Sequence, residues 1–197
     1  LTMTVPRGTV YGLVGPNGAG KSTAIRHLTG VYTPDCGEIT MEGQPIYENT
    51  AVKARIGYIP DDIFYFPSAT LEDMRKFYKG LYPKFDDALF DRLYEIFNLP
   101  PKSPLRRFSK GMQKQAAFWL NLSMQPELLL LDEHTAALDP KTAAKVLDVT
   151  QRIVEKDNLT TLMITHNMRD AIAYGNRLIM MYDGKIVVDV SGEEKKH

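Results

Sequence analysis

Residues 15–22 read Gly-Pro-Asn-Gly-Ala-Gly-Lys-Ser and match the pattern G-x-x-x-x-G-K-[ST] at every fixed position. The short apolar run 10–14 leads into this stretch, and residues 21–29 follow it with apolar side chains at helical spacing. Glycines allow the backbone to curl so that several N–H groups point at one anion, and the positive end of the following helix faces the same place. The sequence therefore predicts a phosphate-binding loop between a buried strand and a helix.

The side chains at the end of this stretch predict a nucleotide with a metal ion. Lys21 would place its ammonium between the β- and γ-phosphates, and the Ser22 hydroxyl would take a position on Mg²⁺. The alternative is a glycine-rich turn that matches the pattern by chance, but the strand before it and the helix after it are the context that the motif requires. We expect ATP and Mg²⁺ as cofactors, with the nucleotide held by Gly15, Pro16, Asn17, Gly18, Ala19, Gly20, Lys21, Ser22 and Thr23.

A pair of acids ends a second apolar run. Residues 128–131 are four leucines, followed directly by Asp132 and Glu133. A strand buried on both faces delivers its last residues to the carboxyl edge of the sheet, where α/β proteins bind their ligands. Asp132 would hold Mg²⁺, directly or through water, and Glu133 would orient or deprotonate the attacking water. The competing interpretation is a core strand that runs into an acidic surface loop.

The rest of the chain alternates between strand and helix patterns. Further apolar runs at 56–59, 160–165 and 178–182 predict an α/β fold of the P-loop NTPase type with a mostly parallel central sheet. Asp183-Gly184 is a strong two-residue turn signal, and it predicts a C-terminal β-hairpin with residues 185–190. Helical patterns also cover about 140–156 and 168–174.

The middle of the chain differs in composition from the rest. Residues 61–117 are helical in pattern and rich in aromatic side chains, which indicates an inserted helical lobe. We therefore divide the chain into a nucleotide-binding core, residues 1–60 and 118–197, and this insert. Most of its rings are expected to form the core of the insert itself. The aromatic residues of its first part are Phe64, Tyr65, Phe66, Phe77, Tyr78, Tyr82 and Phe85.

The bulk composition excludes several classes of protein. The 197 residues carry 24 Lys and Arg against 24 Asp and Glu, so the usual charge argument for nucleic-acid binding is missing. The single cysteine, Cys36, allows no internal disulfide and favours a reducing compartment. No apolar run approaches the roughly 18 residues of a transmembrane helix.

Three further motifs define a resemblance. Residues 108–113 read Phe-Ser-Lys-Gly-Met-Gln, residues 137–140 read Ala-Leu-Asp-Pro, and His166 follows the apolar run 160–165. The order is phosphate loop, helical insert, Ser-x-Gly signature, apolar strand with Asp-Glu, Leu-Asp-Pro and then a strand that ends in histidine. This order resembles the ATP-binding subunit of ABC transporters over essentially the whole chain.

The resemblance implies roles at the matching positions. Ser109 and Gly111 would begin a helix whose N-terminus touches the γ-phosphate held by a second subunit, so that dimerisation completes the active site. His166 would contact the γ-phosphate and help to hold the attacking water, and Asp139 would line the dimer seam. Taken alone, Ser109 would be read as a simple helix N-cap, and His166 as a polar residue that ends a strand.

The chain departs from the family pattern in several places. The family signature is Leu-Ser-Gly-Gly-Gln, and three of its five positions differ here. Asp61 stands where the family has a glutamine that touches Mg²⁺, so we include Asp61 among the metal residues with Ser22 and Asp132. The family also stacks adenine on an aromatic residue about 25 positions before the loop, whereas Gly15 has fourteen residues before it. On that basis we expect weak ATP affinity and poor discrimination among bases.

The two parts of the chain resemble different branches of the family. Residues 1–131 resemble exporter-type subunits, and the sequence from 132 onward resembles subunits of uptake systems. A recombined or truncated chain, which folds and binds phosphate without efficient turnover, is therefore one alternative. The others are a non-transport ABC ATPase, which usually carries two nucleotide domains or long coiled coils, and a small-molecule kinase, which would need a lid with arginines.

We expect an ATPase that energises transport. Its partners would be a transmembrane permease and a second nucleotide-binding domain, with no nucleic acid. The chain would lie at the cytoplasmic face of the cell membrane, attached only through the permease.

Overall fold

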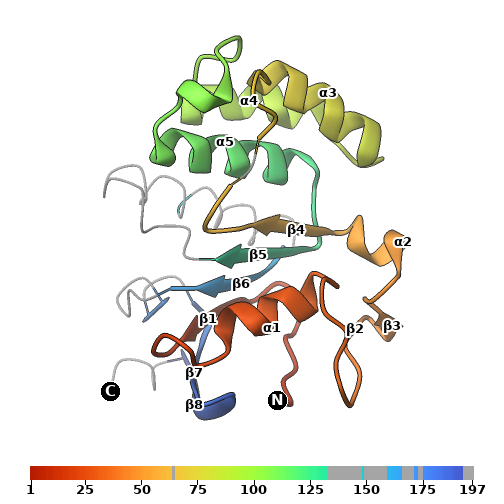
Figure 1. Cartoon of the computed structure of the whole chain (residues 1–197), viewed down its shortest axis with the longest axis vertical. Helices are drawn as coiled ribbons and strands as arrows, with labels where there is room; N and C mark the ends of the chain where they lie inside the picture. Colours follow the sequence, from red (N-terminus) through yellow and green to blue (C-terminus); the bar gives the residue numbers. More distant parts are fainter. Residues whose placement is uncertain (64, 133–147, 149–158, 166–170, 173–174, 193–197) are drawn as a thin grey trace.

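A six-stranded sheet forms the centre of the molecule in a computed structural model that describes residues 1–63, 65–132, 148, 159–165, 171–172 and 175–192 (Figure 1). The strand order is β4-β5-β6-β1-β7-β8. The first five of these strands pair in parallel and β8 pairs antiparallel with β7. The strands are β1 Val10–Val14, β4 Ile56–Ile59, β5 Leu128–Asp132, β6 Thr160–Ile164, β7 Arg177–Tyr182 and β8 Lys185–Ser191. The predicted α/β fold with a mostly parallel sheet and a C-terminal hairpin is confirmed.

The central strands are buried along their whole length. Every residue of β1 and β6 is buried, as is every residue of β5 except the first. Strands that are covered on both faces have continuous apolar sequences rather than sequences that alternate between apolar and polar residues. For this reason Leu128–Leu131 could be predicted as a strand although its residues do not alternate. The loop over residues 15–20, which follows β1, therefore starts from a rigid base.

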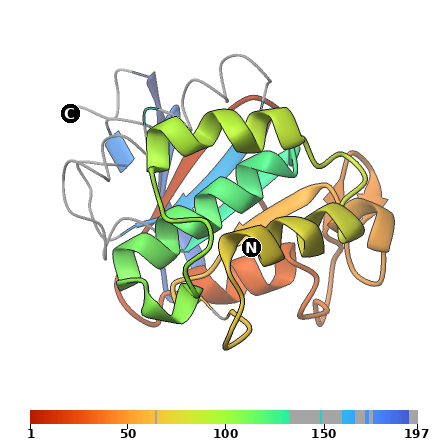
Figure 2. The same cartoon turned by 90° about the horizontal axis from the view of Figure 1, so that it is seen from above.

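In the part of the chain that the structure describes, the helices form two groups around this sheet. In the first group, α1 lies across the sheet beside the small hairpin of β2 and β3 (Figure 1). In the second, α3 and α4 lie over α5 beyond the β4 edge of the sheet (Figures 1 and 2). The bounds are α1 Lys21–Leu28, α2 Thr50–Lys53, α3 Leu71–Leu81, α4 Asp87–Phe97, the short 3₁₀ helix Leu105–Arg107, α5 Lys110–Ser123, β2 Thr40–Met41 and β3 Gln44–Pro45.

Side-chain caps begin all three helices of the second group. Thr70 forms a reciprocal capping box with Asp73 at the start of α3. Asp86 accepts from the Leu89 amide at the start of α4, and Ser109 accepts from the Met112 amide at the start of α5. These contacts fix where each helix begins, and the start of α5 matters for the site described below.

Trp119 of α5 organises the aromatic core of this helical layer. Its ring stacks on Phe97 with centroids 6.0 Å apart and lies 4.8 Å from that of Phe90. Its indole N–H donates to the Phe90 carbonyl oxygen at 2.7 Å. Tyr65, Tyr78 and Phe85 pack against the same cluster, whereas Phe66 and Phe77 are exposed.

Several sequence predictions fall outside the described residues. They are Phe64, Glu133, Asp139, His166, the helix expected over 140–156 and most of that expected over 168–174. The division of the chain at residues 60/61 and 117/118 remains an interpretation, and α5 runs as one helix across the second of these boundaries.

Candidate nucleotide-binding site

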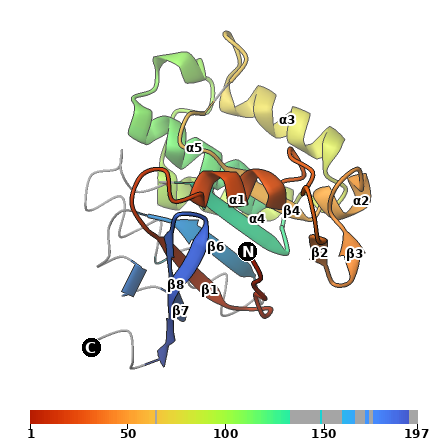
Figure 3. The same cartoon turned by 60° about the horizontal axis from the view of Figure 1, so that its bottom comes forward.

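The loop over residues 15–20 joins β1 directly to α1 and curls at the carboxyl edge of the sheet (Figure 3). The Ala19 amide donates to the Pro16 carbonyl oxygen at 3.2 Å, which closes the turn. The first hydrogen bond into α1 comes from the Ala24 amide to the Gly20 oxygen. The amides of Lys21, Ser22 and Thr23 precede it and have no acceptor within the helix. They form the positive end of α1, which is suited to an anion.

Two glycines make this curl possible in different ways. At Gly15, φ is +149°, and an added Cβ would lie 2.2 Å from the Met181 carbonyl oxygen. At Gly18, φ is +81°, but an added Cβ would meet nothing within 4 Å among the described residues. Gly15 is therefore required by close packing against β7, whereas Gly18 lies beside open space where a ligand can approach the backbone.

Lys21 lies inside the curl of the loop. The residue is only 6% exposed, and its ammonium donates to the carbonyl oxygens of Gly15 at 2.8 Å and Pro16 at 3.0 Å. An ammonium has three donors, so among the described residues these two bonds leave one N–H for another acceptor. Lys21 thus stabilises the loop and places a positive charge at its centre.

The C-terminal hairpin of β7 and β8 packs against the phosphate loop. The Gly184 amide donates to the Ala19 carbonyl oxygen at 3.1 Å, and Met181 borders both Gly15 and Gly20. The register pairs Val14 with Met180, so the two strands run together up to the point where the loop begins. Sequence reasoning identified this hairpin but not its contact with the loop, because no local pattern indicates that β7 is the neighbour of β1.

The first acid of the pair lies at the same edge of the sheet as the loop. Asp132 is the last residue of β5 and is 9% exposed. Tyr58 of β4 pairs with Leu130, two residues before Asp132, and the pKa of its hydroxyl is raised by burial and further by the charge of Asp132. Thr165 follows β6 at this edge, and its amide donates to the Leu13 carbonyl oxygen at 3.3 Å. Glu133 comes directly after β5 and His166 comes after Thr165, but both lie outside the described residues.

Asp61 follows β4 at this same edge, but its carboxylate is paired with a lysine of α5. Its Oδ1 accepts from the Lys114 ammonium of α5 at 2.8 Å. The structure therefore places Lys21, Ser22 and Asp132 at one edge of the sheet. Asp61 lies at the same edge, where its carboxylate forms an ion pair with Lys114. Lys114 was missed by sequence reasoning, although a lysine within the apolar pattern of a predicted helix is a usable signal.

Ser109 begins α5, as its place in the signature indicates. Its hydroxyl accepts from the Met112 amide at 3.2 Å, and both Ser109 and Lys110 are exposed. Gly111 lies in the first turn of the same helix. The helix therefore presents a capped, accessible N-terminus to solvent, which is a second place where an anion can be held.

The donors at the sheet edge suit a nucleotide with Mg²⁺. Mg²⁺ is usually held by one or two carboxylates or hydroxyls together with phosphate oxygens, not by a cage of protein ligands. The exposed Ser22 hydroxyl and the buried Asp132 carboxylate match this pattern. Within the described residues, no three His, Cys, Asp or Glu side chains form a cluster that could hold a metal alone. The amides and Lys21 provide the complementary positive charge for phosphates.

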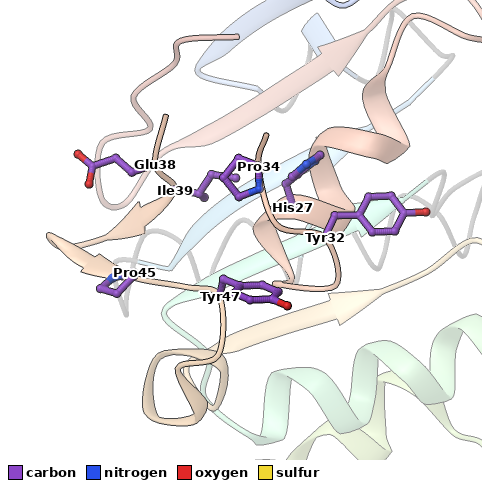
Figure 4. Close-up of a pocket in the computed structure, with 7 residues that line it drawn as sticks. All are labelled: His27, Tyr32, Pro34, Glu38, Ile39, Pro45 and Tyr47. Carbon is purple, nitrogen blue, oxygen red and sulfur yellow. The ribbon is translucent and has the colours of Figure 1, made fainter. Parts of the chain in front are cut away.

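A small pocket of about 140 Å³ lies at the other end of α1 (Figure 4). His27 is in the last turn of this helix, and its Nδ1 contacts the Thr23 carbonyl oxygen at 2.8 Å. The lining is mainly aromatic and apolar, so it differs in character from the phosphate loop. The residues that line it are His27, Tyr32, Pro34, Glu38, Ile39, Pro45 and Tyr47.

A mostly parallel sheet, a glycine-rich loop that leads into a helix and an acid at the end of a nearby strand define a P-loop nucleoside triphosphatase domain. Comparison with known proteins gives the family within this class. The family model described as ABC transporter matches residues 1–136.

Individual relatives agree with this match. A tyrosine transport ATP-binding protein of Clostridioides difficile is 34% identical over 214 residues, covering 100% of this chain and 85% of the relative. The energy-coupling factor transporter ATP-binding protein EcfA2 of Ligilactobacillus salivarius is 30% identical, covering 98% of this chain and 72% of the relative. A solved ATP-binding subunit of an ABC transporter superposes with a TM-score of 0.90 at 26% identity, covering 98% of this chain and 83% of that one.

The chain belongs to the ABC transporter family of ATP-binding subunits. It is an ATPase, and ATP with Mg²⁺ is what its site binds. Within the described residues, no helix combines the length and apolar character needed to cross a membrane.

Proposed function

We propose that two copies of this nucleotide-binding domain, or this one and a close homologue, close around ATP to drive a transmembrane permease. The observation that carries the proposal is the arrangement of two anion-binding helix ends. One is the N-terminus of α1 with Lys21, and the other is the capped and exposed N-terminus of α5 at Ser109. A second subunit would bring its own Ser109 and Gly111 to the nucleotide held by the first.

We assign the following roles within one site. Residues 15–23 hold the phosphates, and Ser22 and Asp132 hold Mg²⁺, which neutralises charge on the phosphate oxygens when it is bound. Glu133 orients and deprotonates the attacking water, and His166 holds that water beside the γ-phosphate. Asp139 lines the seam between the subunits. Supporting this assignment, the strands that precede Glu133 and His166, β5 and β6, are neighbours and end at the loop's edge of the sheet.

The test uses Glu133→Gln, which removes the carboxylate that activates water and keeps its size. With Mg²⁺ and ATP, this variant is expected to accumulate as a dimer on size exclusion, and without nucleotide it should elute as a monomer. Two additional substitutions in this background probe the second helix end. Ser109→Asn and Ser109→Asp both keep a residue that can cap α5.

Only the aspartate places a negative charge where the partner's phosphate would lie. Ser109→Asp is therefore expected to abolish the dimer, whereas Ser109→Asn should weaken it less. ATP binding by the monomer should be similar in both. A Glu133→Gln chain that stays monomeric at saturating Mg²⁺ and ATP would contradict the proposal.

We place the permease contact on the exposed apolar side chains of α3 and of the segment that precedes it. Phe66 and Phe77 are exposed, their rings pack edge to face with centroids 5.5 Å apart, and Leu81 extends this apolar surface to the end of the helix. An exposed apolar patch of this kind is suited to an apolar face of a short helix from a permease. Attached in this way, the chain would lie at the cytoplasmic face of the membrane.

Leu81→Glu tests this contact. In cells that contain the complete transporter, the fraction of the chain recovered with membranes is expected to fall. The free energy of unfolding of the isolated chain should change by less than about 0.5 kcal/mol, because Leu81 is exposed. Unchanged membrane recovery would place the contact elsewhere.

A further inference from the structure

The pocket at the C-terminal end of α1 has room for a single aromatic ring. Its volume of about 140 Å³ is close to the roughly 150 Å³ of an apolar cavity that holds benzene. Five of the seven lining residues carry rings, namely His27, Tyr32, Pro34, Pro45 and Tyr47. Tyr32 and Tyr47 are 41% and 44% exposed, so the pocket is open to solvent on their side. Because aromatic rings pair with other rings edge to face or offset-stacked, this lining suits a ligand with one aromatic ring.

Neighbouring side chains hold the two tyrosine rings of the pocket in place. Arg26 Nη1 donates to the Tyr32 hydroxyl at 3.1 Å, and the His27 ring packs edge to face against the Tyr32 ring with centroids 5.6 Å apart. The Lys53 ammonium lies over the Tyr47 ring, 5.9 Å from its centre. A ligand that binds against rings already held in this way loses less free energy to the ordering of side chains.

Two cations beside the pocket favour an anionic ligand over a cationic one. The Arg26 guanidinium lies over the Tyr32 ring, 5.7 Å from its centre, so each tyrosine ring has a cation next to it. Lys53 also donates to the Gly30 carbonyl oxygen at 3.1 Å, and both cations keep further N–H donors. Within the described residues, no carboxylate pairs with Arg26 or Lys53. Glu38 lines the pocket as well, but its carboxylate points away from the other labelled side chains (Figure 4).

We propose that this pocket binds a small molecule that consists of one aromatic ring and an acidic group. The ring packs against Tyr32 and Tyr47, and the acidic group accepts hydrogen bonds from Arg26 or Lys53 at the edge of the pocket. The site lies at the C-terminal end of α1, whereas the phosphate loop leads into the N-terminal end of this helix. ATP and this ligand can therefore bind to the chain at the same time.

Two ligands of similar size and opposite charge test this assignment. 4-Hydroxyphenylacetate and tyramine share a phenol ring, and their side chains end in a carboxylate and an ammonium. Each is titrated at neutral pH into the ¹⁵N-labelled chain without nucleotide, and the amide chemical shifts are followed by two-dimensional NMR. The variants are Tyr47→Ala, Lys53→Met and Arg26→Met. The controls are Tyr94→Ala, at a ring of α4 that is also 44% exposed, and Lys76→Met, at an exposed lysine of α3.

The acid is expected to bind the parent chain with a Kd of about 1–5 mM, as befits a ligand of about eleven non-hydrogen atoms. The chemical-shift changes should lie mainly in residues 26–32 and 45–53. Tyramine should bind about fivefold more weakly, the size of effect expected for exposed charges. Tyr47→Ala should weaken binding of the acid about tenfold, because it removes a ring that contacts the ligand. Lys53→Met should reduce the preference for the acid over tyramine, and Tyr94→Ala should behave like the parent.

Three results would overturn the inference. The first is the absence of saturable shifts at acid concentrations well above the expected Kd. The second is binding of the acid that is as tight in Tyr47→Ala as in the parent, which would place the ligand elsewhere. The third is tyramine binding as tightly as the acid, or a preference for the acid that survives both Lys53→Met and Arg26→Met. None of these measurements depends on dimerisation or on a permease, so their outcome leaves the proposed function untouched.

Discussion

Asp132 and Leu13 pair with the same residue, Ile164 of β6, from opposite sides. Asp132 is therefore level with Leu13, which lies two residues before the phosphate loop, and is separated from it by two strand spacings, about 10 Å. Neither residue is near the other in sequence. Their alignment places a buried carboxylate beside the loop that holds Lys21, and this is the basic geometry of the site.

Asp132→Asn removes the charge and keeps the size of the side chain. We expect ATP hydrolysis to fall about 100-fold or more, because a metal-bound carboxylate contributes several kcal/mol of charge stabilisation. The dependence of nucleotide affinity on Mg²⁺ should also weaken, which can be measured by titrating Mg²⁺ at fixed ATP. Far-UV circular dichroism provides the control for folding. Wild-type Mg²⁺ dependence in the variant would exclude Asp132 as a metal residue.

Lys21→Met keeps the buried alkyl chain and removes the ammonium that binds Gly15 and Pro16. Nucleotide affinity is expected to fall about 10- to 100-fold, since hydrogen bonds to charged groups contribute more than neutral ones. Isothermal titration with ATP measures this change. Lys76→Met, an exposed lysine of α3, should bind like the parent. Equal affinities of the two variants would contradict the role of Lys21.

Substitutions at two glycines of the loop should separate effects on folding stability from effects on ATP binding. Gly15→Ala forces a methyl group against the Met181 carbonyl oxygen and should cost about 2–3 kcal/mol of folding free energy. Gly18→Ala should cost only about 1 kcal/mol, from its left-handed backbone, because its methyl group enters open space. That space is where phosphate would approach, so Gly18→Ala should nevertheless weaken ATP binding about tenfold or more. Urea unfolding and ATP titration together test the contrast.

Trp119→Phe probes the core of the helical layer. It removes the indole donor from the Phe90 carbonyl oxygen and leaves space between Phe90 and Phe97. We expect a loss of about 2–3 kcal/mol in folding free energy. Urea unfolding followed by circular dichroism is the measurement, because Trp119 is the only tryptophan. Tyr94→Phe, at an exposed ring beside Trp119, should stay within about 0.5 kcal/mol of the parent.

Glu127 should make the free energy of unfolding depend on pH in the acid range. The Arg55 guanidinium binds both of its carboxylate oxygens, at 2.9 and 2.6 Å, and Lys84 adds a contact at 3.0 Å. These bonds lower the pKa of Glu127 to about 2, against the effect of its burial. Because the folded-state pKa lies below the unfolded one, the stabilisation is complete above the ordinary pKa of about 4.5 and is lost as pH falls toward 2.

Glu127→Gln measures this contribution. The side chain is 22% exposed, so after allowance for solvent screening the loss at neutral pH is on the order of 2 kcal/mol. The difference between parent and variant should shrink between pH 4.5 and 2. A difference that stays constant with pH would mean that Glu127 is not the titrating group. Unfolding in urea at a series of pH values gives the comparison.

The elements that could be predicted from the sequence are those whose signal is local. The motif of residues 15–22 requires a strand before it and a helix after it, and Leu128–Leu131 is a strand because its continuous apolar run is buried on both faces. Asp183-Gly184 specified the hairpin of β7 and β8 because a two-residue turn allows little else. In each case the physical cause acts within a few residues of the chain.

Which of these elements are neighbours could be learned only from the folded chain. That β6 lies between β1 and β5, and that β7 supports the phosphate loop through Gly184, depends on strand order, which no single segment specifies. The pairing of Asp61 with Lys114 spans 53 residues and exists because α5 packs beside β4. Local sequence sets the conformation of a segment, whereas its contacts depend on how all segments together bury their apolar faces.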